Sequence, residues 1–298
     1  MIVITAPTGQ IGRQLVSNLL DSGESLRLIA RDASRLPDSV ARHAEIIEGS
    51  HGDPAVVDKA FSGADAVFWL YPSDPQAPDA RSAVLDFTRP AADAIAVHGV
   101  PRVVAVSAVG RGFTEHAGLV SLAWEMTDLL ASSGAHVREL AMPTFMDNLL
   151  RQVGPIAEQG VFFEPTSGSV PHPISATRDI AAAAAELLRD HSWTGRSIRP
   201  VLGPQDLSLE QLAMIMSEEL GRPVRFQQVP MEAYRRQLAE GGTSDSMVDA
   251  MVEMMIAKND GLDTQQPRTA ESSTTTSFRT WCAEVLKPAV RHHDQQRN

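Results

Sequence analysis

Short apolar runs rich in β-branched residues alternate with longer amphipathic stretches through the first half of the chain. This alternation predicts a parallel sheet whose strands are joined by helices. Ala66–Leu70 and Val103–Val106 are apolar throughout, as expected for strands with helices on both faces. We therefore predict an α/β fold, a doubly wound parallel sheet of the Rossmann type. The predicted strands are Ile2–Thr5, Leu26–Ala30, Ala44–Glu48, Ala66–Leu70, Val103–Ser107 and Val137–Leu140, and the helices between them are Gly9–Leu20, Ala33–Ala41, Pro54–Phe61, Arg81–His98 and Leu119–Ser132.

The pattern changes after about residue 143. Residues 143–173 are rich in Pro and Gly and predict a loop with little helix. Further on, the pattern divides the chain into residues 1–150, a smaller C-terminal α/β part over 151–290 that packs on them, and a disordered tail over 291–298. The elements predicted in the smaller part are helices at Ser175–Arg189, Ser208–Leu220, 231–240 and 244–258, a short strand at 224–229, and a polar, partly mobile segment at 260–277.

Composition and charge narrow the classes of function. The net charge of −11 disfavours binding to the phosphate backbone of nucleic acids, and no basic run predicts a membrane surface. Cys282 is the single cysteine, which excludes an intrachain disulfide and fits a reducing compartment. The first residues lack a signal-peptide pattern, and no apolar stretch reaches the ~18 residues of a membrane span. We expect a cytoplasmic protein with a small-molecule substrate.

A glycine-containing loop, Ala6-Pro-Thr-Gly-Gln-Ile-Gly12, follows the first strand and opens the first helix. Glycines at such a turn let the backbone approach a pyrophosphate, and the helix N-terminus offers free N–H groups. A glycine pattern alone is weak evidence, but its position in a strand–turn–helix unit strengthens it. We predict a dinucleotide site at Thr8, Gly9, Gln10, Ile11 and Gly12.

The end of the second strand indicates which dinucleotide binds. Folds specific for NAD usually carry an acidic residue there, whereas this chain has Ala30 and Arg31. A guanidinium suits a 2′-phosphate, because it forms charge-assisted bidentate hydrogen bonds. Asp32 could instead pair with Arg31 or Arg35 and leave a solvated surface pair. We predict NADP(H) in preference to NAD(H).

Several motifs occur in an order that resembles the NmrA-like family of atypical short-chain dehydrogenases/reductases. The resemblance covers residues 1 to about 285. It implies an NADP(H)-binding protein that either reduces quinones or other small carbonyl compounds or acts as a redox-sensing regulator. The motifs are Thr8-Gly9-x-x-Gly12, Ala30-Arg31-Asp32, Gly49…Asp53, Ser107-Ala-Val-Gly110, Ser133-Gly134, Pro143…Phe145-Met-Asp-Asn148, Ser175-Ala-Thr-Arg-Asp179 and Leu207-Ser-Leu-Glu-Gln211.

The resemblance also implies roles for single residues. Thr8 to Ile11 would hold the pyrophosphate and Arg31 the 2′-phosphate. Residues 1–150 would then be the NADP-binding domain and 151–290 the substrate-binding part. The sequence departs from the family pattern at Ala6, which replaces the first glycine, and at Ser50, where an Asp near the adenine is usual. The other implied positions are Leu70, Tyr71 and Pro72 along the ribose, Ser107 at the end of the fifth strand, Pro143, Thr144 and Phe145 near the nicotinamide, and Trp124, Met146 and Asn148 in a substrate pocket.

The catalytic residue is not evident from the sequence. Enzymes of this superfamily use Tyr-x-x-x-Lys, but neither Tyr71 nor Tyr234 stands at that spacing from a lysine, and the two positions correspond to Ala123 and Thr127. The candidates for a proton donor are Tyr71, His116 and His172. Each has a plainer interpretation: packing on the ribose, an exposed loop residue and a turn histidine.

A conjugated acceptor such as a quinone needs less help from an acid, because its reduced oxygen is a stabilised anion. The first hypothesis is therefore an NADP(H)-dependent oxidoreductase that acts on a small conjugated carbonyl or quinone-type compound. The alternatives are an NADP(H)-binding redox sensor without turnover and a protein that catalyses a non-redox step. Met247, Met251, Met254 and Met255 predict either a flexible substrate lid or an ordinary packed helix. No metal site is predicted, and the chain is compatible with a homodimer.

Overall fold

A computed structural model of the protein describes residues 1–297 and shows a seven-stranded sheet. The strand order is β10-β6-β5-β4-β1-β2-β3, and every neighbouring pair is parallel. The predicted doubly wound α/β fold is confirmed. The strands are β1 (Ile2–Thr5), β2 (Leu26–Ala30), β3 (Ala44–Glu48), β4 (Ala66–Trp69), β5 (Arg102–Ala108), β6 (His136–Met142) and β10 (Arg196–Pro200).

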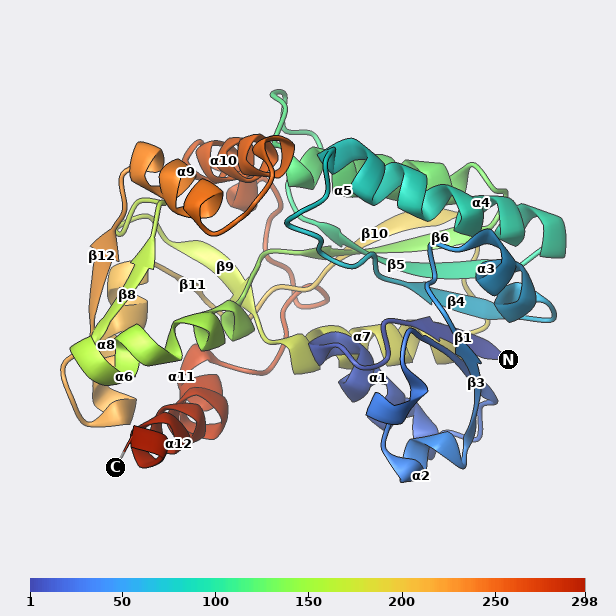
Figure 1. Ribbon diagram of the computed structural model, residues 1–298, viewed down its shortest axis with the longest axis horizontal. Helices are drawn as coiled ribbons and strands as arrows, with labels where there is room; N and C mark the ends of the chain where they lie inside the picture. Colours follow the sequence, from blue (N-terminus) through green and yellow to red (C-terminus); the bar gives the residue numbers. More distant parts are fainter. Residues whose placement is uncertain (298) are drawn as a thin grey trace.

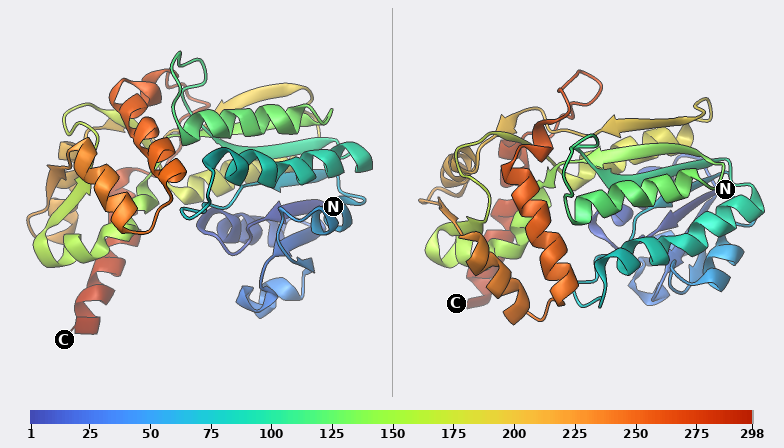
Figure 2. Two further views of the ribbon diagram at one scale, coloured as in Figure 1. Left: turned by 45° about the horizontal axis from the view of Figure 1, so that its top comes forward. Right: turned by 90° about the horizontal axis from the view of Figure 1, so that it is seen from above.

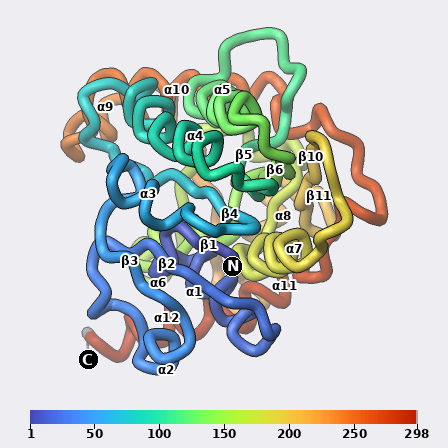
Figure 3. Tube along the Cα trace, turned by 90° about the vertical axis from the view of Figure 1, so that its right-hand side faces the viewer, coloured from blue at the N-terminus to red at the C-terminus, as the bar shows by residue number. Residues whose placement is uncertain are grey.

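Helices cover both faces of this sheet, as Figures 1 and 3 show. One face carries α1 (Gln10–Leu20) and α7 (Thr177–Arg189), and the other carries α3 (Pro54–Phe61), α4 (Phe87–His98) and α5 (Leu119–Ala131). A short α2 (Asp38–Ala41) precedes β3, and a π-helical turn at Ser82–Asp86 precedes α4.

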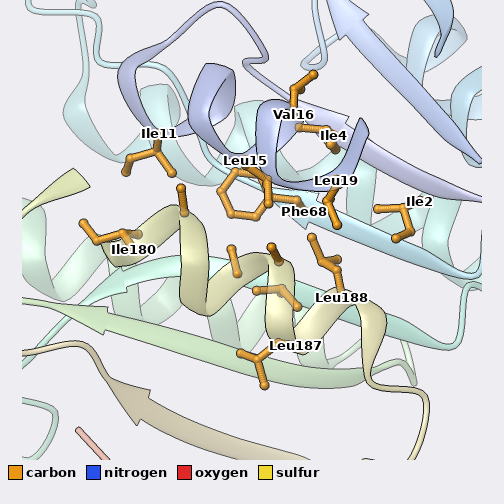
Figure 4. Close-up of a cluster of buried hydrophobic side chains, with 14 of the residues drawn as sticks. Ile2, Ile4, Ile11, Leu15, Val16, Leu19, Phe68, Ile180, Leu187 and Leu188 are labelled. Atoms are coloured by element: carbon orange, nitrogen blue, oxygen red, sulfur yellow. The ribbon is translucent and has the colours of Figure 1, made fainter. Parts of the chain in front are cut away.

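The core between α1 and α7 shows why these sequences form helices. Leu15 and Leu19 lie four residues apart in α1 and are fully buried against Phe68 of β4 and Leu188 of α7 (Figure 4). Spacing of three or four residues places apolar side chains on one helical face. Burial of each such leucine stabilises the fold by roughly 1.5–3 kcal/mol.

The C-terminal part forms a smaller body beside the sheet, with its own core around Phe162, Met216 and Trp281 (Figure 1). β9 pairs with β7 and β11, and β8 pairs with β12. Its strands are β7 (Thr144–Phe145), β8 (Val161–Glu164), β9 (His172–Ser175), β11 (Asp206–Leu207) and β12 (Arg225–Gln228), and its helices are α6 (Val153–Gln159), α8 (Leu209–Leu220), α9 (Met231–Glu240), α10 (Asp245–Asn259), α11 (Phe278–Trp281) and α12 (Lys287–Arg297).

The structure corrects three predictions about this half of the chain. Residues 143–173 are not mostly loop, because they contain the 3-10 helix Met146–Gln152, α6, the strands β7 and β8, and the start of β9. The predicted disordered tail is helical up to Arg297, because α12 buries Val290 in the smaller core, while Asn298 lies outside the described residues. Segment 260–277 is tied to the fold by backbone hydrogen bonds from Leu202 to Ser272 and from Thr274 to Leu202.

The predicted division at residue 150 does not follow the edge of the large sheet. β10 pairs with β6, and α7 packs on α1, although both come from beyond residue 150. A polar strand such as β10 carries no apolar run that would reveal it in the sequence. Within residues 1–297, no helix has both the length and the apolar composition that a membrane span requires.

Candidate functional site: a dinucleotide edge and an adjoining cavity

The loop after β1 lies at the point where the order of the strands in the sheet reverses. β1 pairs with β2 on one side and with β4 on the other, so the strand order changes direction here, and in open α/β sheets ligands bind at the carboxyl ends of the strands at such a point. α1 begins at Gln10 with Gly9 as its N-cap, and no side chain caps it or places an acidic group in its first turn. Its first N–H groups are therefore open to an anion.

Close backbone contact explains the glycine at position 12. A Cβ atom at Gly12 would lie 2.0 Å from the carbonyl oxygen of Ala6, so the loop and the helix could not approach as they do. Ala6, which replaces the usual first glycine, has a left-handed φ of 49° and accepts a 3.0 Å hydrogen bond from the Gly9 amide. The turn is therefore retained despite the substitution, and the loop fits a pyrophosphate.

Arg31 lies at the end of β2 with an exposed side chain. Asp32 does not pair with it: Asp32 Oδ1 accepts hydrogen bonds from the Ser34 amide at 3.0 Å and the Ser34 hydroxyl at 2.6 Å. These bonds hold the pKa of Asp32 below its usual value. In the described part of the chain, neither Arg31 nor Arg35 forms an ion pair, so the guanidinium of Arg31 remains available to a phosphate.

The segment after β4 is fixed by two side chains. Thr5 Oγ1 donates to the Phe68 carbonyl and accepts from the Leu70 amide, both at 3.0 Å. His51, which the sequence analysis did not single out, places Nε2 3.0 Å from the Leu70 carbonyl. Burial lowers the pKa of His51 to about 4, so its neutral ring donates this bond while packing edge-on against Trp69. Both backbone polar groups of Leu70 are thus hydrogen-bonded to side chains, which places the start of the segment Leu70–Pro72.

A cavity of about 290 Å³ opens where β5 and β6 end, at the same edge of the sheet. Seven predicted site residues line it: Ser107, Pro143, Thr144, Phe145, Met146, Asn148 and His172. The smaller body and α10 supply the other lining residues. α10, orange in Figure 2, packs against α9 and α5. Met254 and Met255 of α10 line the cavity, whereas Met247 packs in the core of the large sheet, as an ordinary packed helix predicts. The flexible substrate lid stays a prediction.

Three other predicted residues lie outside the cavity lining. The Trp124 indole is buried and donates to the Ala108 carbonyl at 3.0 Å, so it braces the end of β5. His116 is exposed and pairs with Glu253 of α10 at 3.0 Å. Tyr71 packs against the core, and burial raises the pKa of its phenol. Of the three candidates for a proton donor, only His172 lines the cavity; its pKa is lowered by burial.

Ala123 and Thr127, the counterparts of the Tyr-x-x-x-Lys pair, take part in other contacts. Ala123 is buried and accepts a hydrogen bond from the Ser107 hydroxyl through its backbone carbonyl. Thr127 donates to Glu139 Oε2 at 3.0 Å, inside a buried network with Arg111. Neither side chain lines the cavity.

The charged groups of the cavity were missed by sequence reasoning. Lys258 Nζ lies 2.6 and 2.8 Å from the two carboxylate oxygens of Asp263 and 3.1 Å from Thr144 Oγ1. Glu164 of β8 also lines the cavity, and burial raises its pKa to about 7, against the opposing effect of the Lys258 charge. The one local signal for Lys258 was its position four residues after Met254, on the same face of the helix.

Fold and site together define a dinucleotide-binding protein of the Rossmann type with a substrate-sized cavity beside the dinucleotide edge. The pattern of the NmrA-like family matches residues 1–281, and this chain belongs to that family.

Its relatives include enzymes named as reductases. The chain is 28% identical to the NAD(P)H azoreductase of Xenophilus azovorans over 254 residues, which is 85% of this chain and 86% of that protein. It is 30% identical to (4-alkanoyl-5-oxo-2,5-dihydrofuran-3-yl)methyl phosphate reductase of Streptomyces griseus over 239 residues, 80% of each chain. The structure of an NADPH-dependent quinone oxidoreductase from Escherichia coli, complexed with NADPH, has a TM-score of 0.78 at 22% identity and covers 99% of this chain and 100% of that one.

Proposed function

We propose that this protein, an NAD(P)H-dependent oxidoreductase of the NmrA-like family, uses NADPH to reduce a small conjugated carbonyl or quinone-type compound. The observation that carries the proposal is the cavity at the ends of β5 and β6, which adjoins the dinucleotide edge of the same sheet. A hydride donor and an acceptor held at one edge can meet without either crossing the protein. The named activities of the relatives support the reaction class.

The residues of the dinucleotide edge fit NADPH. The uncapped N-terminus of α1 would hold the pyrophosphate, and Arg31 would hold the 2′-phosphate. Pro143, Thr144 and Phe145 would lie near the nicotinamide, since they follow β6 directly. When bound, NADPH supplies the hydride.

The lining of the cavity favours an uncharged, largely apolar substrate. Most of the wall is aliphatic, aromatic or methionine, and the charge of Lys258 is balanced by Asp263. Glu164 adds a carboxyl group that is half-protonated near pH 7. A phosphorylated substrate would face these carboxylates without an unpaired cation in the cavity lining, so we expect it to bind poorly.

A titration with NADPH and NADH, followed by fluorescence, tests the cofactor. Absorbance of the nicotinamide band, measured with a panel of quinones and enones, tests turnover. We expect tighter binding of NADPH and oxidation by at least one neutral member of the panel. Tight binding without turnover by any acceptor would contradict the reductase proposal and favour the redox sensor, and no binding of either cofactor would contradict both.

A further inference from the structure

The wall of the cavity carries a hydroxyl group whose O–H donates to no acceptor among the described residues. Thr144 Oγ1 accepts a hydrogen bond from Lys258 Nζ at 3.1 Å. A hydroxyl can accept and donate at the same time. Among the hydrogen bonds of residues 1–297, none uses the Thr144 hydroxyl as a donor. Because Thr144 lines the cavity, its O–H is available to a molecule bound there.

Lys258 is held in place and has no spare donor. Its ammonium carries three N–H groups, and three oxygens surround it: both carboxylate oxygens of Asp263 and the hydroxyl of Thr144. The side chains of Lys258 and Asp263 are only 13% and 6% exposed, so water screens this arrangement weakly. The ammonium therefore polarises the Thr144 hydroxyl from the acceptor side and makes its proton a stronger donor.

Lys258 is the only lysine or arginine in the described lining of the cavity. His172 also faces the cavity, and burial disfavours its charged form. The acidic groups of the lining are Glu164 on β8 and Asp263, the partner of Lys258. Negative charge that develops on a substrate can thus be met by one polarised hydroxyl backed by one cation.

We propose that Thr144 donates a hydrogen bond to the substrate oxygen that becomes negative during reduction, while Lys258 polarises this hydroxyl and Asp263 positions Lys258. The inference rests on the proposed reductase function. The hydride that bound NADPH would supply adds to the β carbon of the conjugated carbonyl, the C=C π pair shifts to form a double bond to the carbonyl carbon, and the C=O π pair moves to the oxygen. The Thr144 O–H stabilises the resulting enolate, which in a quinone becomes the phenolate by tautomerisation. Water then supplies the proton. Thr144 of β7 and Lys258 of α10 thus supply a hydroxyl and a lysine. α5 lacks the tyrosine hydroxyl and the lysine of the Tyr-x-x-x-Lys pair, because Ala123 and Thr127 stand at those positions.

Thr144→Val is the most direct test, because it removes the hydroxyl and keeps the shape. With an acceptor from the quinone panel, we expect kcat to fall by about 10²-fold. Lys258→Met should give a similar loss, Thr144→Ser should retain most of the activity, and Lys59→Met on α3 should behave as wild type. NADPH affinity, measured by fluorescence, should stay unchanged in Lys258→Met and Lys59→Met, and in Thr144→Val it should fall much less than kcat does. Unchanged kcat in Thr144→Val with an active wild type would overturn the inference and leave the proposed function standing.

Removing Lys258 alone leaves Asp263 buried without its partner, which can unfold the protein. The double variant Lys258→Met/Asp263→Leu removes both charges and should also lose kcat while remaining folded. Full activity in this variant would contradict the role of Lys258.

A probe that needs no turnover separates the two proposals. 4-Nitrophenol at pH 7 binds either as the phenol or as the coloured phenolate, so its absorbance reports the bound form. We expect wild type to enrich the phenolate, and Thr144→Val to bind it about tenfold more weakly, as the loss of one hydrogen bond to a charged group predicts. Phenolate binding that depends on Thr144 without oxidation of NADPH by any acceptor would refute the reductase proposal but retain the oxyanion site. Equal binding by both proteins would overturn the site.

Discussion

The two parts of the candidate site are built in different ways. The dinucleotide edge consists mainly of backbone groups from one continuous segment, Thr8–Gly12, and its added cation, Arg31, is exposed and unpaired among the described residues. The cavity consists of side chains from separate elements, with its cation Lys258 buried and paired. A backbone site depends on chain geometry, whereas a side-chain cavity depends on the identity of each residue. The first therefore selects a cofactor common to many relatives, and the second can select a substrate.

The largest effect is expected at the dinucleotide edge, which consists mainly of backbone groups. Gly12→Ala places a Cβ atom 2.0 Å from the Ala6 carbonyl oxygen, so the loop or the helix must move. We expect NADPH affinity to fall by about 100-fold or more, because several hydrogen bonds to a charged phosphate are lost together. Isothermal titration calorimetry measures this loss.

Gly154→Ala is the matched control. Gly154 lies in α6, and the nearest atom to its added Cβ is 3.9 Å away. Alanine is the better helix former, so this variant should be more stable by roughly 0.5–1 kcal/mol, with unchanged affinity for NADPH. Normal NADPH binding by Gly12→Ala would show that the close approach of the loop is unnecessary.

The next effect tests the electrostatics of the cavity. The pKa of Glu164 is raised from its usual 4.5 to about 7, so the unfolded chain releases this proton at a lower pH than the folded one. The stabilising contribution of the neutral carboxyl is full below about pH 4.5 and is lost as the pH rises to about 7, a difference of about 3 kcal/mol. Glu164→Gln should therefore be more stable than wild type at pH 8 and similar to it at pH 4, in urea unfolding.

His51, on the dinucleotide side, should show the opposite sign. Its pKa is lowered from 6.5 to about 4, so its contribution is present above about pH 6.5 and is lost as the pH falls to about 4. His51→Gln should remove this acid-dependent loss and leave the alkaline range unchanged.

Parallel pH profiles of wild type and Glu164→Gln would refute the burial of a titrating carboxyl in the cavity.

A smaller, selective effect is expected at Arg31. Arg31→Glu should weaken NADPH binding by about 10- to 100-fold through loss of charge-assisted hydrogen bonds, and NADH binding much less. Arg42→Glu, an exposed change at the end of α2, serves as the control for charge alone. Equal losses for NADPH and NADH in fluorescence titrations would refute the role of Arg31.

The smallest effect is expected at His116. Its ring pairs with Glu253 at the surface, where ion pairs contribute little because water and salt screen them. His116→Ala should leave kcat and KM within about twofold of wild type, as expected for an exposed residue outside the cavity lining. A large loss of kcat would place the proton donor at this histidine and outside the cavity.

Local patterns in the sequence determined six of the seven strands of the large sheet and the turn that joins β1 to α1. The runs Ile2–Thr5, Leu26–Ala30 and Ala44–Glu48 are the observed β1, β2 and β3 to the residue. β1 is buried and apolar except at Thr5, as expected for a strand covered on both faces, whereas β3 lies at the sheet edge and keeps a short apolar pair, Ile46-Ile47, between exposed glutamates. The predicted helix Ser208–Leu220 starts at the residue that caps α8, because Ser208 forms a capping box with Gln211. Such signals lie within a few residues of the structure that they specify.

Only the tertiary structure decided the cavity and the ends of the smaller body. β10 pairs at the sheet edge with few apolar residues, and α12 is ordered by the burial of Val290 against distant elements. Thr144 and Lys258 are 114 residues apart in the chain and meet at 3.1 Å. Contacts at this separation leave no periodicity in the sequence, because each residue satisfies its own local pattern and only packing brings the two together.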